Sequence, residues 1–298
     1  MVSLPRPFAL DMIARGTNGL ARLLLPGWVA ANDRVFHATT TTDQTFSQLA
    51  TTLALYGTSV FGLCAVVDIA LVRPLTRWNL KRVTGKSPDA ATVKKTGWFL
   101  LHTIFNSLIV GVSLSEAWSV FRNPIENGFS PRGWWGTHPA SLFGAIAIGG
   151  FHMHHLAVYT ESTTTEDVVH HLTNAGAVVV IGALAPWGRF TALSNLAMCG
   201  VPGAINYFML WAQTPKGPQK AINRLLNIAL RYPVQLFSIY GLTMAALNGS
   251  QPRVHPVTVA LMVAGAGAHT LNALYYADLV VGNYHVTQSR AAVGKKSE

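Results

Sequence analysis

Five of the 11 histidines lie close together in the chain, where two apolar segments meet. His152, His154 and His155 come late in the first segment, and His170 and His171 open the second. In a helix, His152 and His155 share a face and His154 points away from it. The adjacent pair His170 and His171 diverge by about 100°. We therefore expect several imidazoles at one end of the two segments, but not the convergence of all five.

Three kinds of chemistry are open to these side chains. A neutral imidazole acts as a general acid or base, a role open to His170 or His171 on an embedded nucleophile. A haem held by two imidazoles needs histidines from two helices at one depth, and His102 with His155 or His269 are the candidates. Membrane di-iron oxygenases need a larger set of HxxxH and HxxHH boxes, which the sequences HMHH and HH do not match. On chemistry alone, hydrogen bonding between helices is the favoured interpretation.

The composition excludes an ordinary soluble protein. Of the 298 residues, 50% are apolar and 11% are charged, whereas about 25% are charged in soluble domains. Cys64 and Cys199, the two cysteines, lie inside apolar runs. Neither a disulfide framework nor a cysteine-based zinc site is expected from them, and no metal site is predicted.

About seven segments are long and apolar enough to cross a membrane, which takes about 20 residues in a helix. Because each backbone amide in lipid must be bonded within its own segment, these are helices rather than strands. The predicted fold is an all-α polytopic membrane helix bundle. Its segments cover residues 48–72, 97–121, 138–159, 168–187, 190–211, 221–248 and 254–281. Pro233 interrupts the sixth, which is either one kinked helix or an interfacial helix leading into a short one.

The N-terminal part, residues 1–47, has a different character. Residues 8–25 form an amphipathic helix that either lies in the membrane plane or serves as a targeting presequence. We divide the rest of the chain into residues 48–96, a first span with a basic loop, residues 97–285, a membrane domain of six helices, and residues 286–298, a basic tail.

The net charge of +10 is concentrated in the loop after the first span. Short basic loops stay on the cytoplasmic or matrix side of a membrane. Trp78 is the one aromatic residue interleaved with these charges, so phosphates at the membrane surface explain the loop better than nucleic acid does. The predicted phosphate-binding residues are Arg73, Arg77, Lys81, Arg82, Lys94 and Lys95.

Carboxylates near the ends of the spans are expected at the membrane surface rather than in a catalytic site. Asp68 lies five residues before Arg73, and Glu116 lies six before Arg122. Asp278 near the end of the last span is interpreted in the same way.

Several short motifs occur in an order that resembles the TLC-domain family, which includes ceramide synthases and lipid-modulating relatives. They are the Leu101 and His102 pair, the stretch 151–155, the pair His170 and His171, the stretch 225–233 with Arg231, and the stretch 272–276. The resemblance covers about residues 97–285. It implies a barrel-like bundle of six helices around a lipid-accessible cavity. The residues expected to line it are His102, His152, His155, His170, His171, Arg231, Tyr275 and Tyr276.

One departure from that family bears on catalysis. In ceramide synthases, further His and Asp residues complete the acyl-transfer site. Here no acidic residue occurs from Val168 to Trp211. A base without a carboxylate to orient it makes a poor acyltransferase site.

The sequence therefore predicts a non-catalytic, lipid-binding membrane protein that acts as a scaffold or accessory subunit of a larger complex. The mitochondrial inner membrane is favoured, with the endoplasmic reticulum as the alternative. Expected partners are membrane lipids, including anionic phospholipids, and other membrane-protein subunits, and no cofactor beyond a structural phospholipid is expected. The alternative function is a lipid N-acyltransferase that uses His170 and His171. A transporter is disfavoured, and a retinal protein is excluded because the last span has no lysine.

Overall fold

The computed structural model describes residues 46–124, 139–159, 164–172, 189–247 and 256–294, and every element in these ranges is helical. The predicted all-α fold is confirmed. The amphipathic segment 8–25 and most of the fourth predicted span lie outside the described residues.

In the described part of the first half of the chain, the backbone forms one long helix with an internal irregularity, a second long helix and two shorter ones. These elements are α3 (Phe46–Val67), η1 (Asp68–Val72), α4 (Arg73–Thr84), α5 (Ala90–Arg122), α7 (Pro139–Val158) and α8 (Thr165–Leu172), where η denotes a π-helical turn. α4 ends at Gly85, whose φ of 71° is the left-handed conformation that favours glycine. α5 begins at Asp89, whose carboxylate accepts a hydrogen bond from the Thr92 amide at 2.7 Å.

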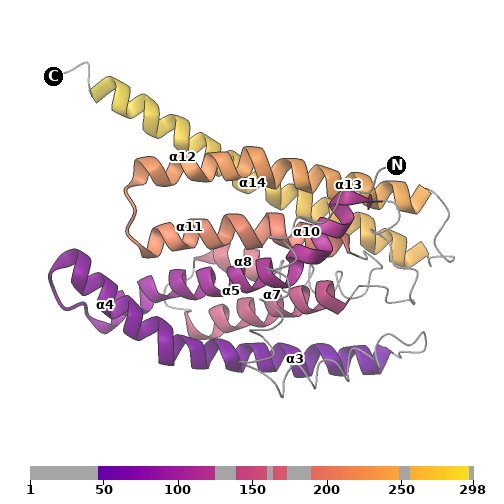
Figure 1. Cartoon of the computed structure of the whole chain (residues 1–298), viewed down its shortest axis with the longest axis horizontal. Helices are drawn as coiled ribbons and strands as arrows, with labels where there is room; N and C mark the ends of the chain where they lie inside the picture. Colours follow the sequence, from indigo (N-terminus) through magenta and orange to yellow (C-terminus); the bar gives the residue numbers. More distant parts are fainter. Residues whose placement is uncertain (1–45, 125–138, 160–163, 173–188, 248–255, 295–298) are drawn as a thin grey trace.

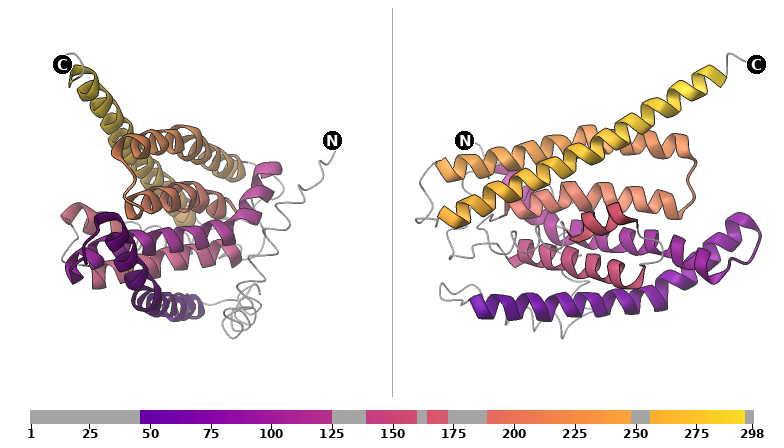
Figure 2. Two further views of the ribbon diagram at one scale, coloured as in Figure 1. Left: turned by 60° about the vertical axis from the view of Figure 1, so that its left-hand side comes forward. Right: turned by 180° about the vertical axis from the view of Figure 1, so that it is seen from behind.

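The second half contains two more interrupted helices and a final long one. They are α10 (Phe190–Asn195), η4 (Leu196–Gly200), α11 (Val201–Trp211), α12 (Lys216–Leu226), η5 (Asn227–Arg231), α13 (Tyr232–Leu247) and α14 (Pro256–Gly294). α14 has 39 residues and therefore a length of about 58 Å. It continues past residue 281, where the last span was predicted to end, and its C-terminal part projects beyond the other helices (Figure 2).

Each of these three π-helical turns ends two residues before a proline. The pairs are Asp68–Val72 with Pro74, Leu196–Gly200 with Pro202, and Asn227–Arg231 with Pro233. Proline lacks an N–H and its ring clashes with the carbonyl four residues earlier. In each case the residue before the proline donates its N–H to the carbonyl five residues back, and this wider turn lets the helix continue. The sixth predicted span is thus one continuous helix from Lys216 to Leu247.

α5 is the centre of the bundle, packed against α7, α10 and α11, while α7 also packs along α3 (Figure 1). Close approach requires glycine at two of these contacts. A Cβ on Gly150 of α7 would stand 2.8 Å from the carbonyl oxygen of Gly57 and from Val60, both on α3. A Cβ on Gly203 of α11 would stand 2.5 Å from the Asn106 side chain of α5. Small residues of this kind allow helix backbones to pack closely.

Polar and apolar side chains are distributed in an unusual way. Among the described residues, two helical stretches, Ala54–Thr84 and Ala90–Arg122, are apolar and long enough to cross a membrane, and less than half of the most apolar part of each is buried. The predicted bundle of seven spans is therefore not confirmed. Large apolar side chains such as Leu55, Val66 and Ile69 face outward. Many polar side chains lie inside, including Asp68, Thr76, Asn79, His102, Asn106, Ser113, His154, Asn195 and Asn227.

Candidate functional site

α5, α7 and α8 bring five histidines together, which we name the histidine cluster: His102 from α5, His152 and His155 from α7, and His170 and His171 from α8. One ring nitrogen each of His102, His155 and His171 lie within 4.8 Å of one another, and all three side chains are buried. The same spacing holds for His152, His170 and His171, of which His170 is half-buried. His171 thus belongs to two overlapping groups of three.

α8 is positioned by a capping box. Thr164, the residue before the helix, donates its backbone N–H to the Asp167 carboxylate at 3.0 Å. Asp167 returns the bond through its own N–H to the Thr164 hydroxyl at 3.2 Å. This reciprocal arrangement satisfies two amides at the start of the helix and sets the direction in which His170 and His171 leave its last turn.

Two of the histidines have a defined tautomer. Nδ1 of His102 lies 2.8 Å from the Trp98 carbonyl oxygen, and Nδ1 of His152 lies 2.8 Å from the Ile148 carbonyl oxygen. Because a carbonyl oxygen only accepts, Nδ1 carries the proton in both neutral rings. The Nε2 lone pair of each ring is then left for another partner.

His155 and His171 are in direct contact. Nδ1 of His155 meets Nε2 of His171, and the ring centroids are 4.3 Å apart. Nδ1 of His171 is buried and has no hydrogen-bond partner in the described part of the chain. At least one ring nitrogen of the histidine cluster is therefore buried without a partner among the described residues.

Aromatic rings enclose the inner part of the cluster. Trp98 packs against His102 and His155 with centroid distances of 4.3 and 4.5 Å. Phe151 and Tyr207 each lie 4.3 Å from the His102 ring. Edge-to-face and tilted packing of this kind shields the imidazoles from solvent.

The structure places one carboxylate near the cluster, which corrects the argument from missing acids. Asp167 lies one residue before the acid-free stretch 168–211 and interacts electrostatically with His171 and His155. Burial works against the charged form, but the hydrogen bonds from Thr164 and these histidines outweigh it, so the pKa of Asp167 lies below its usual value. His171 therefore has an acidic neighbour that the search from residue 168 onward missed.

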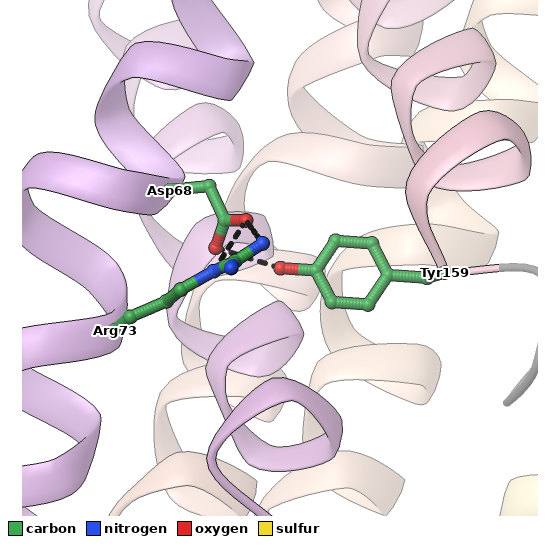
Figure 3. A network of polar contacts seen from close by, with 3 residues as sticks. All are labelled: Asp68, Arg73 and Tyr159. Carbon is green, nitrogen blue, oxygen red and sulfur yellow. Dashed lines mark hydrogen bonds and ion pairs between the residues drawn. The ribbon is translucent and has the colours of Figure 1, made fainter. Parts of the chain in front are cut away.

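A second polar network joins η1 and α4 to Tyr159, the residue that follows α7 (Figure 3). Arg73 donates to Asp68 Oδ2 from Nη2 at 2.8 Å and from Nε at 3.1 Å, and Tyr159 donates its hydroxyl to Asp68 Oδ1 at 2.8 Å. Asp68 was expected at the membrane surface, yet its side chain is only 1% exposed. The pairing with Arg73 was predicted, whereas the burial and Tyr159 were not. Arg73, expected to bind phosphate, forms this ion pair while its side chain stays 40% exposed.

His154 lies outside the histidine cluster and borders the Asp68 network, because its ring contacts Tyr159 edge-to-face with centroids 6.1 Å apart. It packs edge-to-face on Phe61 of α3, with a centroid distance of 5.3 Å. Both of its ring nitrogens are buried without a hydrogen-bond partner among the described residues. Its separation from His152 and His155 follows the helical spacing expected from the sequence.

Arg231, predicted to line a lipid cavity, forms hydrogen bonds within its own helix and to a neighbouring helix. It donates to Asn227 Oδ1 at 2.8 Å and to the Met198 carbonyl at 3.0 Å. In an α-helix that carbonyl would accept from residue 202, which is a proline without an N–H. Arg231 therefore supplies the donor that the helix of Met198 lacks.

The remaining predicted residues are spread over the surface. Tyr275 on α14 is 53% exposed, and the side chain of Tyr276 lies outside the described residues. Arg77, Lys81, Arg82 and Lys95 are exposed and Lys94 is half-buried. Glu116 forms an ion pair with Arg189 of the segment before α10 rather than the expected pair with Arg122 nearby in sequence.

The cluster does not fit the bis-histidine haem considered from the sequence. His102 and His155 are in edge-to-face proximity, with centroids 5.3 Å apart, and Trp98 packs against both rings. This leaves no space for a planar macrocycle between the two imidazoles. The side chain of His269, the other candidate, lies outside the described residues.

Comparisons with family models, with curated proteins and with solved structures gave no match for this chain.

Proposed function

We propose that this chain is an integral membrane protein that binds lipid and serves as a non-catalytic scaffold or accessory subunit of a larger membrane complex. The observation that carries this proposal is the exposure of many large apolar side chains on the outer helix faces, together with the burial of polar side chains beside the apolar core. A soluble helix bundle exposes fewer large apolar side chains, because water drives its apolar faces together. In a bilayer, by contrast, apolar side chains face lipid, and polar ones find partners between helices.

Lipid contact is supported by the outer faces of the first and last helices. On α3 and η1, Leu55, Val66 and Ile69 are among the most exposed apolar side chains. On α14, Leu271 and Leu274 are similarly exposed. Apolar surface of this extent marks contact with lipid or with another subunit.

A basic end of the bundle supports binding of anionic headgroups. Arg77 and Lys81 lie on α4 and Lys95 lies at the start of α5. These two elements meet at the same end of the bundle as the start of α12, which carries Lys216 and Lys220 (Figure 1). Trp78 is 58% exposed there, and the Arg82 guanidinium lies 5.0 Å from the centroid of its ring. Basic side chains beside an exposed tryptophan are typical of the interfacial level of a membrane. The mitochondrial inner membrane fits this charge best, and the endoplasmic reticulum is the alternative.

The test is purification from native membranes in a mild detergent, after a carbonate wash that removes peripheral proteins. We expect the chain to stay in the membrane fraction and to purify with anionic phospholipid and with stable protein partners. Release by carbonate would contradict membrane insertion. A lipid-free monomer without partners would contradict the accessory role.

The acidic neighbour of His171 supports a second candidate, the lipid N-acyltransferase implied by the TLC resemblance. In that reaction His170 or His171 would accept the proton of an amine, and Asp167 would stabilise the resulting imidazolium. The discriminating assay compares membranes carrying wild type, His170→Ala or His171→Ala with acyl-CoA and a long-chain amine. Equal product from all three would end this candidate.

A further inference from the structure

The geometry of the inner histidines points to a metal site. We propose that His102, His155 and His171 bind one divalent transition-metal ion, with Zn²⁺ as the first choice. The three residues come from three different helices, their side chains are buried, and one ring nitrogen each lie within 4.8 Å of one another. This metal site is a property beyond lipid binding, and its test does not depend on whether the protein binds lipid.

The donor set selects the class of ion. Three neutral imidazoles without a carboxylate or thiolate ligand suit Zn²⁺ and its neighbours rather than Mg²⁺ or Ca²⁺, which prefer oxygen. Three protein ligands also leave one tetrahedral position for water, hydroxide or another oxygen ligand.

The spacing is close to what the ion requires. Zn–N bonds of 2.0–2.1 Å hold tetrahedral nitrogens roughly 3.4 Å apart. Nitrogens that lie within 4.8 Å of one another therefore need to approach by no more than about 1.4 Å. Small rotations of the rings bring the more distant nitrogens closer, and they also separate His155 Nδ1 from His171 Nε2, which are in direct contact without an ion.

Groups around the three histidines support ligation. The Trp98 carbonyl accepts the Nδ1 proton of His102 and so directs the Nε2 lone pair toward the ion, as carbonyls do behind metal-bound histidines. A dication among neutral ligands also needs negative charge nearby. Asp167, which interacts electrostatically with His155 and His171, supplies one such charge.

The overlapping group of His152, His170 and His171 is the competing arrangement. His170 is only half-buried, whereas each member of the inner group is buried. The inner group also has the aromatic enclosure formed by Trp98, Phe151 and Tyr207. These observations favour His102, His155 and His171, and variants separate the two groups.

The experiment uses the full chain in detergent, stripped of metal with a chelator and then titrated with Co²⁺, whose visible absorption reports tetrahedral nitrogen ligation. We expect one Co²⁺ per chain and its displacement by Zn²⁺. His102→Ala and His171→Ala are each expected to weaken binding by at least about 100-fold, because second-shell changes alone cost 10–100-fold. His154→Ala is the matched control, since His154 is also a buried histidine of α7 but lies outside both groups. It should bind as wild type does.

Folding of each variant is checked by its helical circular dichroism and its elution as a single species. The wild-type titration decides the proposal even if a variant fails to fold. Folded wild-type protein without a tetrahedral Co²⁺ spectrum would overturn it. Undiminished Co²⁺ binding by His102→Ala would also overturn it. If His170→Ala loses Co²⁺ binding and His102→Ala keeps it, the ion belongs to the group of His152, His170 and His171 instead.

Discussion

Two buried polar regions adjoin at the C-terminal end of α7, where the His155 and Tyr159 ring centroids are 5.8 Å apart, and they differ in how completely their groups are paired. On the side of α3, the Asp68 carboxylate receives hydrogen bonds from Arg73 and Tyr159. On the side of α5 and α8, the histidine cluster brings ring nitrogens together and leaves the buried Nδ1 of His171 without a partner among the described residues. Buried polar groups are nearly always hydrogen-bonded in native proteins. The first region therefore has a structural role, and the second is built to receive a ligand.

His154 shows that an unpartnered nitrogen is not enough to make a site. Its two ring nitrogens lack hydrogen bonds in the described part of the structure, yet it belongs to neither group of convergent histidines. Its ring packs against Phe61 and Tyr159. Convergence of several lone pairs, rather than the lack of a partner at one residue, distinguishes the histidine cluster.

The largest expected loss of stability comes from the network of Asp68, Arg73 and Tyr159. Asp68→Ala leaves the Tyr159 hydroxyl buried without its acceptor and Arg73 without its counter-charge. Breaking a buried ion pair costs about 3–5 kcal/mol, and we expect about 3 kcal/mol because the Arg73 side chain is 40% exposed and can be rehydrated. Denaturant titration in detergent micelles measures the loss. Asp68→Asn, which keeps an acceptor for Tyr159 but removes the charge, should lose less, and equal losses would contradict a contribution from the acceptor of the Tyr159 hydroxyl.

Gly150→Ala tests whether the packing of α7 against α3 can be weakened without loss of metal binding by the histidine cluster. The new Cβ would meet the Gly57 carbonyl oxygen and Val60 at 2.8 Å, so α7 must move away from α3. Overpacking of this kind costs about 1–3 kcal/mol. We expect this loss in the free energy of unfolding while Co²⁺ binding persists, because the His155 ring, although it lies on α7, contacts Trp98 of α5 and His171 of α8. Gly62→Ala on α3, where a Cβ has open space, serves as the control.

Tyr159→Phe removes a single hydrogen bond from the network of Asp68, Arg73 and Tyr159. Oδ1 of Asp68 loses its phenolic donor but keeps the nearby guanidinium. A loss of about 1 kcal/mol is expected, the usual contribution of one hydrogen bond. Thermal unfolding in micelles detects it, and an unchanged midpoint would show that the bond adds nothing to stability.

The smallest effect on stability is expected from His102→Phe in metal-free protein. The ring is surrounded by Trp98, Phe151 and Tyr207, so phenylalanine fits its surroundings chemically. We expect a change below about 1 kcal/mol, together with loss of Co²⁺ binding. A loss comparable with that of Asp68→Ala would indicate a structural role for His102.

The all-helical fold and the grouping of histidines were predictable from local patterns, because apolar segments of membrane length and helical spacing are properties of short stretches. Arg73 and Asp68 were predicted as neighbours, but their geometry depends on η1. Residues five apart point about 140° away from each other in an α-helix. A π-helical turn closes over five residues and brings them to one side.

The rest of the site depends on tertiary packing. His102 joins His155 and His171 only because α5 packs beside α7 and α7 packs beside α8, and no pattern within one helix specifies that. Glu116 likewise pairs with Arg189 from a distant segment, although Arg122 is nearer in sequence. Asp167 was visible in the sequence as part of a Thr164 to Asp167 capping box, and that signal could have identified it as a fixed carboxylate beside the histidine pair.

The most direct test of the difference between the two regions is the thermal unfolding midpoint of metal-free protein with and without Zn²⁺. A ligand at 100 times its Kd stabilises the folded state by about 2.7 kcal/mol. We predict that Zn²⁺ raises the midpoint of wild type and of Tyr159→Phe by the same amount and leaves that of His102→Phe unchanged. Equal midpoints with and without Zn²⁺ in wild type, or an equal rise in His102→Phe, would contradict the assignment of the histidine cluster as a ligand site.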